Sequence, residues 1–495
     1  MAGGGYGETG DAYGGTADAY GGALRLAAGE SVERVVGGLD AAPEAWLALD
    51  AGFREAFRDS SWRPGAERWR FLRSLGLRRA EVYAPSALVL ALCHGDGRIR
   101  EKALRQAEAH PQALPLVVVR CADWAGPVRL RARAVLARML TVERAVALTP
   151  LVLRVGRRDR GDVAVGLVRD VLRQASAAEL RPLLDHPDRR PRRFGVELAL
   201  RGGLFTPVEL ARTAAADPDV VVQDLCADAA LAALPEEGAA RDAVLEPLLT
   251  ARNSRARSTG VTALRRAGRP EPAEAYLSDR STVVRACARW VLREHGVDPL
   301  PRYRALCADP TDPAVPPGAV LGLAECGTRK DTALLRPLLG HPVAAVRARA
   351  VAALRMLDAV DRAELTPLLD DPAPAVVRET AKALLPDARS LDTAALVGML
   401  ASGGPAHRRR WGFTLLAAQG GLPALRATAD LLDDEDEKMR VQASLRLRTW
   451  EPGDRTKGDS EVAALLERTR DHIPRSRLHF LTWATGTTLA PRRDA

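Results

Sequence analysis

A motif that returns about every 31 residues is the feature that most constrains how this chain can fold. Each copy has a turn rich in Asp, His or Pro, then an apolar residue and Arg, then an apolar periodic stretch. Clear copies lie at 279–292, 341–357 and 371–385. Thirteen copies can be placed from Ile99 to Ser476 when the residue before the Arg is the anchor. Periods of roughly 20–50 residues are typical of stacked repeats, so the 495 residues indicate a repeat array rather than about three globular domains.

The spacing within each copy predicts a pair of helices. Three residues after the Arg position the residue is small in ten of the thirteen copies, and seven residues after it eight copies have Leu. Offsets of three and seven lie on one face of an α-helix, so the small residue admits a neighbouring helix and Leu fills the core. The stretch before the turn often ends in Pro-Leu-Leu, and we expect a first helix there, bent at the proline. No stretch has a convincing strand pattern. The sequence therefore predicts an all-α fold, an α-solenoid of about 13 helix-pair repeats with one continuous core.

The repeat resembles the HEAT-repeat family, in the short variety also found in phycobilin-lyase-like proteins. The resemblance is carried by the Asp371-Pro372 turn before Val377-Arg378 and by the His341-Pro342 turn before Val346-Arg347. It covers about residues 84–490 and implies an armadillo/HEAT-type superhelix, with little said about function. In that family the turn Asp and the second-helix Arg resemble a ladder between adjacent repeats. The resemblance implies this structural role for Arg100, Arg129, Arg285, Arg347, Arg378 and Arg440.

Two segments of different composition precede the repeats. Residues 1–22 are rich in Gly and Tyr, and we expect a disordered tail. Residues 23–83 are rich in aromatic residues and predict a helical amino-terminal cap, with amphipathic helices at about 43–58 and 65–75. A docking face for a partner is the alternative interpretation of the same aromatic residues. The repeat solenoid is then expected over 84–495.

The net charge of +9 comes almost wholly from arginine, which supplies 67 of the 72 basic residues. Basic clusters at 157–160, 189–193, 252–257 and 407–410 all fall at the turn between the two helices of a repeat, where stacked turns would form one ridge. Such a ridge could bind a polyanion such as nucleic acid; a solvated surface is the alternative. The candidate anion-binding residues are Arg157, Arg158, Arg189, Arg190, Arg193, Arg255, Arg409 and Arg410. We expect folding to tolerate loss of Arg190, Arg193, Arg255 and Arg409, and to depend on Arg378.

Catalytic and metal-binding motifs are missing from the sequence. There is no phosphate-binding loop, no nucleophile elbow and no HExxH, and no Cys pair is close enough for a zinc site. No His is followed by Glu, which argues against the iron site of the HEAT-like deoxyhypusine hydroxylases. We therefore predict a non-enzyme with no cofactor and no metal. HEAT-like DNA glycosylase and bilin-lyase activities are distant alternatives. For a glycosylase, Trp290 and Trp411 could line a concave surface, but packing between repeats is the favoured explanation of these two residues.

The leading functional prediction is a scaffold that binds protein partners through its curved helical surface, with sequence-independent nucleic-acid binding as the alternative. No apolar stretch is long enough to cross a membrane, and the first residues lack the features of a secretory signal, so we expect a cytoplasmic protein. The sequence does not indicate an oligomeric state.

Overall fold

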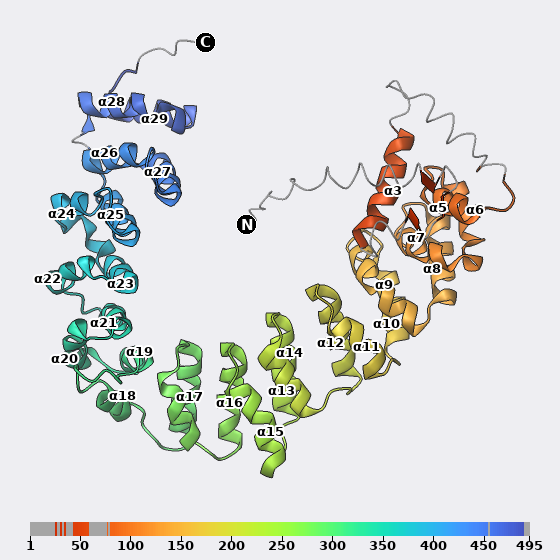
Figure 1. The fold of residues 1–495 in the computed structure, drawn as a ribbon, viewed down its shortest axis with the longest axis horizontal. Coiled ribbons are helices and arrows are strands. Elements are labelled where there is room, and N and C mark those ends of the chain that lie inside the picture. The colour runs from red at the N-terminus through yellow and green to blue at the C-terminus, as the bar shows by residue number, and fades with distance from the viewer. Residues whose placement is uncertain are drawn as a thin grey trace. The chain divides into compact units, whose positions relative to one another are not determined.

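A computed structural model describes residues 25–26, 30–31, 34–35, 43–58, 77, 80–453 and 456–489. Within these ranges every regular element is an α-helix or a 3-10 helix, as the repeat predicted (Figure 1). Residue contacts divide the chain into two compact units, Met1–Ala251 and Arg252–Ala495. Unit 1 and unit 2 are therefore described separately, and the expected single continuous core stays a prediction.

Unit 1 contains helix α3 and five helix pairs. Helix α3 (Pro43–Arg58) has the bounds that the sequence predicted, whereas the second expected helix, at 65–75, lies outside the described residues. The pairs are α5 (Pro85–Cys93) with α6 (Gly97–Leu104), α7 (Leu114–Arg120) with α8 (Gly126–Met139), α9 (Val142–Val155) with α10 (Asp162–Leu172), α11 (Ala177–Leu184) with α12 (Arg189–Arg201), and α13 (Pro207–Ala216) with α14 (Val220–Ala232). Helix α15 (Gly238–Leu249) follows them.

Unit 2 begins with α16 (Ser254–Arg266) and continues with seven helix pairs. They are η4 (Glu271–Ser278) with α17 (Thr282–Glu294), α18 (Leu300–Leu306) with α19 (Pro317–Cys326), α20 (Thr332–Leu335) and η6 (Pro337–Gly340) with α21 (Ala344–Met356), α22 (Arg362–Leu365) and η7 (Thr366–Asp370) with α23 (Pro374–Leu384), α24 (Thr393–Gly398) with α25 (Ala406–Gln419), α26 (Gly421–Leu431) with α27 (Glu437–Thr449), and α28 (Ser460–Arg468) with α29 (Arg475–Thr485). With α15 and α16 counted as a pair in sequence, the described residues hold the thirteen pairs predicted.

Short polar side chains set where many helices begin. Ser176 and Thr206 each form a capping box at a first helix, with Glu179 and Glu209 respectively, so that exposed backbone N–H groups gain acceptors. Asp and Asn side chains cap many second helices in the same way, namely Asp96, Asp188, Asp219, Asn253 and Asp436. The turns before these second helices are therefore fixed by local hydrogen bonds.

The repeated proline has two different effects on the first helices. In unit 1, Pro150 and Pro182 lie inside continuous α-helices. In unit 2, α20 and α22 stop shortly before Pro337 and Pro367, and the chain continues as the 3-10 helices η6 and η7. Proline removes one hydrogen-bond donor and crowds the preceding turn, which explains the change to the tighter helix.

Small residues bring the two helices of a repeat together, as the spacing predicted. Gly195 on α12 lies against α11, where an added Cβ would sit 2.8 Å from the Cβ of Leu183. Gly412 on α25 lies equally close to Met399, which follows α24. At the start of unit 1, α3 packs on the first repeats through the buried side chains of Trp46 and Phe53. The cap at 23–83 stays a prediction because most of that segment, and the whole tail at 1–22, lies outside the described residues.

Candidate anion-binding pocket

The second-helix arginine that the repeat predicted first closes its own turn. Nη1 of Arg347 on α21 donates to the backbone carbonyls of His341 and Pro342, six and five residues earlier, at 2.8 and 3.2 Å. The equivalent arginines of other repeats make the same contact with the carbonyl six residues before them. They include Arg100, Arg129, Arg192, Arg285 and Arg440.

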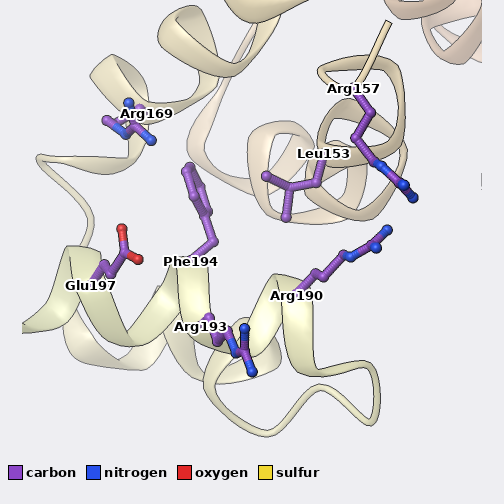
Figure 2. A pocket seen from close by; sticks show the side chains of 7 residues that line it. All are labelled: Leu153, Arg157, Arg169, Arg190, Arg193, Phe194 and Glu197. Carbon is purple, nitrogen blue, oxygen red and sulfur yellow. The ribbon is translucent and has the colours of Figure 1, made fainter. Parts of the chain in front are cut away.

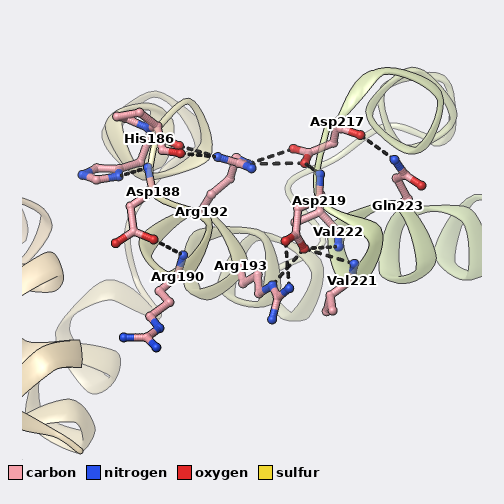
Figure 3. A network of polar contacts seen from close by, with 11 residues as sticks. His186, Asp188, Arg190, Arg192, Arg193, Asp217, Asp219, Val221, Val222 and Gln223 are labelled. Carbon is pink, nitrogen blue, oxygen red and sulfur yellow. Dashed lines mark hydrogen bonds and ion pairs between the residues drawn. The ribbon is translucent and has the colours of Figure 1, made fainter. Parts of the chain in front are cut away.

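The same arginine then contacts the turn of the next repeat. Nε and Nη2 of Arg347 donate to the two carboxylate oxygens of Asp371 at 2.8 and 2.9 Å. Five described pairs join a second-helix arginine to the turn aspartate of the next repeat. Three use Nε and Nη2, as Arg347 does, whereas Arg192 reaches Asp217 through Nε alone (Figure 3) and Arg409 reaches Asp434 through Nη1 and Nη2. The five pairs are Arg100–Asp123, Arg192–Asp217, Arg257–Asp279, Arg347–Asp371 and Arg409–Asp434. We call these pairs the ladder.

Every ladder carboxylate accepts hydrogen bonds from both a guanidinium and the backbone. The backbone donor is the N–H two residues later, which for Asp371 is that of Ala373 at 2.8 Å. Burial opposes ionisation of Asp371, but these hydrogen bonds outweigh it and hold its pKa below the ordinary value. The bond from Arg409 is the main cause that lowers the pKa of Asp434.

The prediction for Arg378 is wrong by one residue of register. Arg378 donates to the adjacent Glu379 and is about half exposed, and the position six residues after Asp371 is the buried Val377. An α-helix turns about 100° per residue, so a shift of one residue moves the side chain out of the ladder. Leu384 is accordingly buried while Leu385 is exposed, although the sequence alignment placed Leu385 in the core.

The prediction for Arg409 is wrong in the opposite sense. It was predicted as a dispensable anion-binding residue, yet its side chain is buried and forms the ladder pair with Asp434. Three residues later comes Gly412 and seven residues later the buried Leu416, which is the spacing of a ladder position. The prediction that folding tolerates loss of Arg409 conflicts with this placement.

The other predicted ladder residues make only part of the contact. Arg129 and Arg440 close their own turns and make no ion pair with a described residue. Arg285 reaches the next repeat through Glu325 on α19, which also accepts from Arg289 at 2.6 Å. The sequence alignment missed Arg192 and Arg257 as named ladder residues, although both follow an anchor of the repeat.

The carboxyl-side basic clusters are largely neutralised. In 407–410 each arginine has an aspartate partner: Arg408 pairs with Asp370, Arg409 with Asp434 and Arg410 with Asp436. In 252–257, Arg257 is a buried ladder residue and Arg255 also has an interaction partner. These clusters therefore offer few unpaired guanidinium groups to a polyanion.

The clusters at 157–160 and 189–193 differ from the carboxyl-side clusters, because arginines from both line one pocket of unit 1. The pocket has a volume of about 430 Å³ and lies between α9, α10 and α12 (Figure 2). Four arginines line it, namely Arg157, Arg169, Arg190 and Arg193. Figure 2 shows Arg157 and Arg190 extending toward one another from different repeats.

The remaining wall of the pocket combines apolar and acidic groups. Leu153 and the mostly buried Phe194 line it together with Glu197. The guanidinium carbon of Arg169 lies 5.4 Å from the centre of the Phe194 ring, within the range of a cation–π contact. This contact orients Arg169 over the ring and covers one face of it.

One of the four arginines, Arg193, is already paired with a carboxylate of the protein. Nε and Nη2 of Arg193 donate to Asp219 at 2.8 and 2.7 Å, and Asp219 also accepts from the N–H groups of Val221 and Val222 at the start of α14 (Figure 3). The bond from Arg193 is the main cause that lowers the pKa of Asp219. Arg157, Arg169 and Arg190 make no ion pair with any residue that the structure describes.

The pocket thus contains three of the eight arginines that the sequence singled out, Arg157, Arg190 and Arg193. Arg158 and Arg189 are exposed and do not line it. Sequence reasoning missed Arg169, Phe194 and Glu197, since only the stacking of α10 on α12 brings them to one place. A partial signal existed for the paired arginines: the aspartate lies 26 residues after both Arg193 and Arg410.

Among the described residues, no group of three or more His, Cys, Asp or Glu side chains is placed to hold a metal ion. Over the same part of the chain, no helix has the length and apolar character needed to cross a membrane.

Comparisons with known proteins give likenesses of fold alone. No family model and no curated protein matches the chain. The chain is similar to a crystal structure of importin beta, with 13% identity, a TM-score of 0.34, and coverage of 96% of this chain and 77% of that one. It is also similar to a Kap121p mutant, with 14% identity and a TM-score of 0.28. That match covers 87% of this chain and 53% of the other, so the chain spans about half the length of that protein. A TOG-domain array from a study of tubulin recruitment is similar with 14% identity and a TM-score of 0.22, and the match covers 80% of this chain and 97% of that one. The described residues form helix pairs whose neighbouring repeats are joined by the Arg–Asp ladder, which is the architecture of an α-solenoid.

Proposed function

We propose that the chain is a non-enzymatic scaffold that binds protein partners through the surface of its second helices. The observation that carries the proposal is the placement of exposed apolar side chains. Among the described residues, ten large apolar side chains are exposed on second helices, against a single one, Val397, on a first helix. The ten are Leu130, Val220, Val221, Val283, Trp290, Met356, Val441, Leu445, Phe480 and Trp483.

The second helices form a surface within each unit. In unit 2, Figure 1 shows α21, α23, α25 and α27 on one side of the stack, with α20, α22 and α24 on the other. Single exposed apolar residues are ordinary, but their concentration on one set of helices is typical of a surface that is covered by a partner. Trp290 is held under Arg265, 4.9 Å from the guanidinium carbon to the ring centre, and aromatic and arginine side chains are common anchors in interfaces.

Affinity capture with matched variants tests this proposal. Val441 and Leu445 lie one turn apart on α27, and both are more than half exposed, so glutamine at both positions should leave folding intact. We expect extracts of the source cell to yield protein partners with the wild type and with Val397→Gln, and to yield them poorly with Val441→Gln/Leu445→Gln. Equal recovery by the two variants would overturn the proposal, as would recovery of nucleic acid without protein.

Nucleic-acid binding along the turns is the second candidate, and one observation favours it: the unpaired arginines Arg157 and Arg190 lie in a shared pocket. The pairing of Arg408, Arg409 and Arg410 with aspartates weighs against a continuous ridge. A salt titration of duplex and single-stranded DNA binding decides between the two, because phosphate contacts give a steep dependence on salt. Weak binding that is unchanged in Arg157→Gln/Arg190→Gln would exclude this candidate.

A further inference from the structure

The pocket between α9, α10 and α12 has a charge that is not balanced by its own residues. Arg193 is neutralised by Asp219, which leaves three guanidinium groups, on Arg157, Arg169 and Arg190, against the carboxylate of Glu197. The net charge of the unpaired groups is therefore +2. Like charges that share a small volume repel one another, so an anion that enters the pocket gains both attraction and relief of this repulsion.

The charge of the pocket matches one type of anion best. A phosphate monoester on a serine or threonine carries a charge of about −1.5 to −2 at neutral pH and offers three strong acceptor oxygens. Guanidinium groups bind such oxygens through paired, charge-assisted hydrogen bonds. Arg157 and Arg190 extend toward one another from two repeats and could therefore contact the same phosphate from two sides (Figure 2).

Three features of the pocket disfavour a polynucleotide. Glu197 places a negative charge in the wall, where it would repel the phosphates on either side of a bound one. Phe194 is mostly buried and its ring is covered by Arg169, so it offers no open face on which a base could stack. Within the same cluster Arg192 is buried and Arg193 is paired, so the unpaired charge does not continue along α12.

We infer that the pocket of unit 1 binds the phosphate group of a phosphorylated serine or threonine on a protein partner, with Arg157 and Arg190 as its main contacts. This inference rests on the proposed function as a protein-binding scaffold and specifies the chemistry of one partner. Leu153 supplies an apolar wall for the residue next to the phosphate, and Glu197 can accept a backbone N–H of the bound segment.

Fluorescence anisotropy with the full chain tests the inference. The probe is a labelled library of nine-residue peptides with a central phosphoserine and randomised flanks, compared with the same library carrying serine or glutamate and with a 20-nucleotide oligothymidylate. The test variant is Arg157→Gln/Arg190→Gln. The matched control is Arg158→Gln/Arg189→Gln, which removes the same charge from exposed arginines of the same two clusters outside the pocket.

We expect the wild type to prefer the phosphoserine library to both other libraries. Two charge-assisted contacts contribute about tenfold each, so the test variant should bind about a hundredfold more weakly, and the control should stay within about threefold of the wild type. Equal binding of the phosphoserine and serine libraries would overturn the inference. An equal loss of affinity in the test and control variants would also overturn it, because binding would then depend only on the overall charge of the chain. A preference of the wild type for the oligonucleotide would overturn it as well.

The outcome is separable from that of the proposed function. If the phosphoserine library does not bind, while protein capture still depends on Val441 and Leu445, the pocket assignment fails and the scaffold proposal stands. If protein capture is unchanged in Val441→Gln/Leu445→Gln, the scaffold proposal fails, whether or not the phosphoserine library binds.

Discussion

Arg347 and Asp371, 24 residues apart, form a two-bonded ion pair that joins adjacent repeats, with donor–acceptor distances of 2.8 and 2.9 Å. The remaining nitrogen of the same guanidinium closes the turn at His341. One side chain therefore fixes its own turn and also attaches the next one. This arrangement determines which arginines of the chain stabilise the fold and which can serve a ligand.

Replacing a ladder arginine should cost far more stability than replacing an arginine one register away. Arg409→Ala leaves the mostly buried carboxylate of Asp434 without its guanidinium partner, for which we expect a loss of about 3 kcal/mol in the free energy of unfolding. Arg378→Ala removes one cation beside the buried Glu379, which keeps its contact with Lys382, and should lower the free energy of unfolding by at most about 1 kcal/mol. Urea denaturation of the two variants measures both. Similar losses would show that the ladder assignment is mistaken.

The ladder carboxylates also predict how stability depends on pH. The pKa of Asp434 is lower in the folded chain than its ordinary value of 3.8, so its contribution is full above that value and is lost as the pH falls through the folded pKa. The urea midpoint should thus be nearly constant from about pH 7 to pH 5 and then fall. The difference in midpoint between the wild type and Asp434→Asn should narrow over the same acidic range. A difference that stays constant to pH 3 would contradict this origin of the pH dependence.

Two turn positions hold histidine, His186 and His341, and the previous repeat offers neither of them a ladder arginine. Helix α19, which precedes His341, contains no arginine, and α10, which precedes His186, has none in its first turn. The Val343 N–H donates to Nδ1 of His341 at 3.0 Å, so Nε2 carries the ring proton and donates to the carbonyl of Asp312 at 2.9 Å. The imidazole thus gives hydrogen-bond partners to both the Val343 N–H and the Asp312 carbonyl, and the turn needs no guanidinium from the previous repeat.

We therefore expect His341→Asp to be destabilising, although Asp is the usual residue of this turn. It would bury a carboxylate that has no arginine partner and would remove one of the two donors to the Asp312 carbonyl, which keeps the N–H of Val315, at a cost of about 2 kcal/mol or more. His341→Asn, which keeps a neutral acceptor for the Val343 N–H, should cost less. Thermal denaturation at pH 7 ranks the two variants, and an Asp variant at least as stable as the Asn variant would refute the pairing rule.

The contact between Gly322 and Tyr303 leaves no room for a side chain. A Cβ added to Gly322 on α19 would lie 2.1 Å from Cε1 of the fully buried Tyr303, so Gly322→Ala should destabilise the chain by about 1–3 kcal/mol. Gly166 on α10 has nothing within 4 Å of its added Cβ. Gly166→Ala should stabilise by about 0.5–1 kcal/mol, because glycine is unfavourable inside a helix. Calorimetric unfolding of both variants checks the opposite signs.

The all-helical repeat fold could be predicted because its signal recurs thirteen times and each copy supports the others. The register of single repeats could not be fixed in the same way. Arginine is so common here that an alignment on Arg slides by one residue, which placed Arg378 in the ladder and Arg409 outside it. The buried Leu384 and Gly412 indicate the true register, but burial is a property of the packed helices.

The candidate site was predictable only in part, for a related reason. A basic cluster in the sequence says nothing about which carboxylates will neutralise it, and Arg410 and Arg193 have partners on the following repeat. The unpaired state of Arg157 and Arg190 and the presence of Arg169 beside them depend on how α10 stacks against α12. The sequence could therefore indicate the clusters but not the pocket.

Site-specific photo-cross-linking tests the central claim, that second helices carry the protein-binding surface, most directly. Benzoylphenylalanine placed at Leu445 on α27 and at Val397 on α24 replaces two similarly exposed apolar side chains on the two kinds of helix. We expect irradiation in source-cell extract to give nuclease-resistant protein adducts at position 445 and few at position 397. Equal adducts at the two positions, or adducts that nuclease removes, would contradict the account.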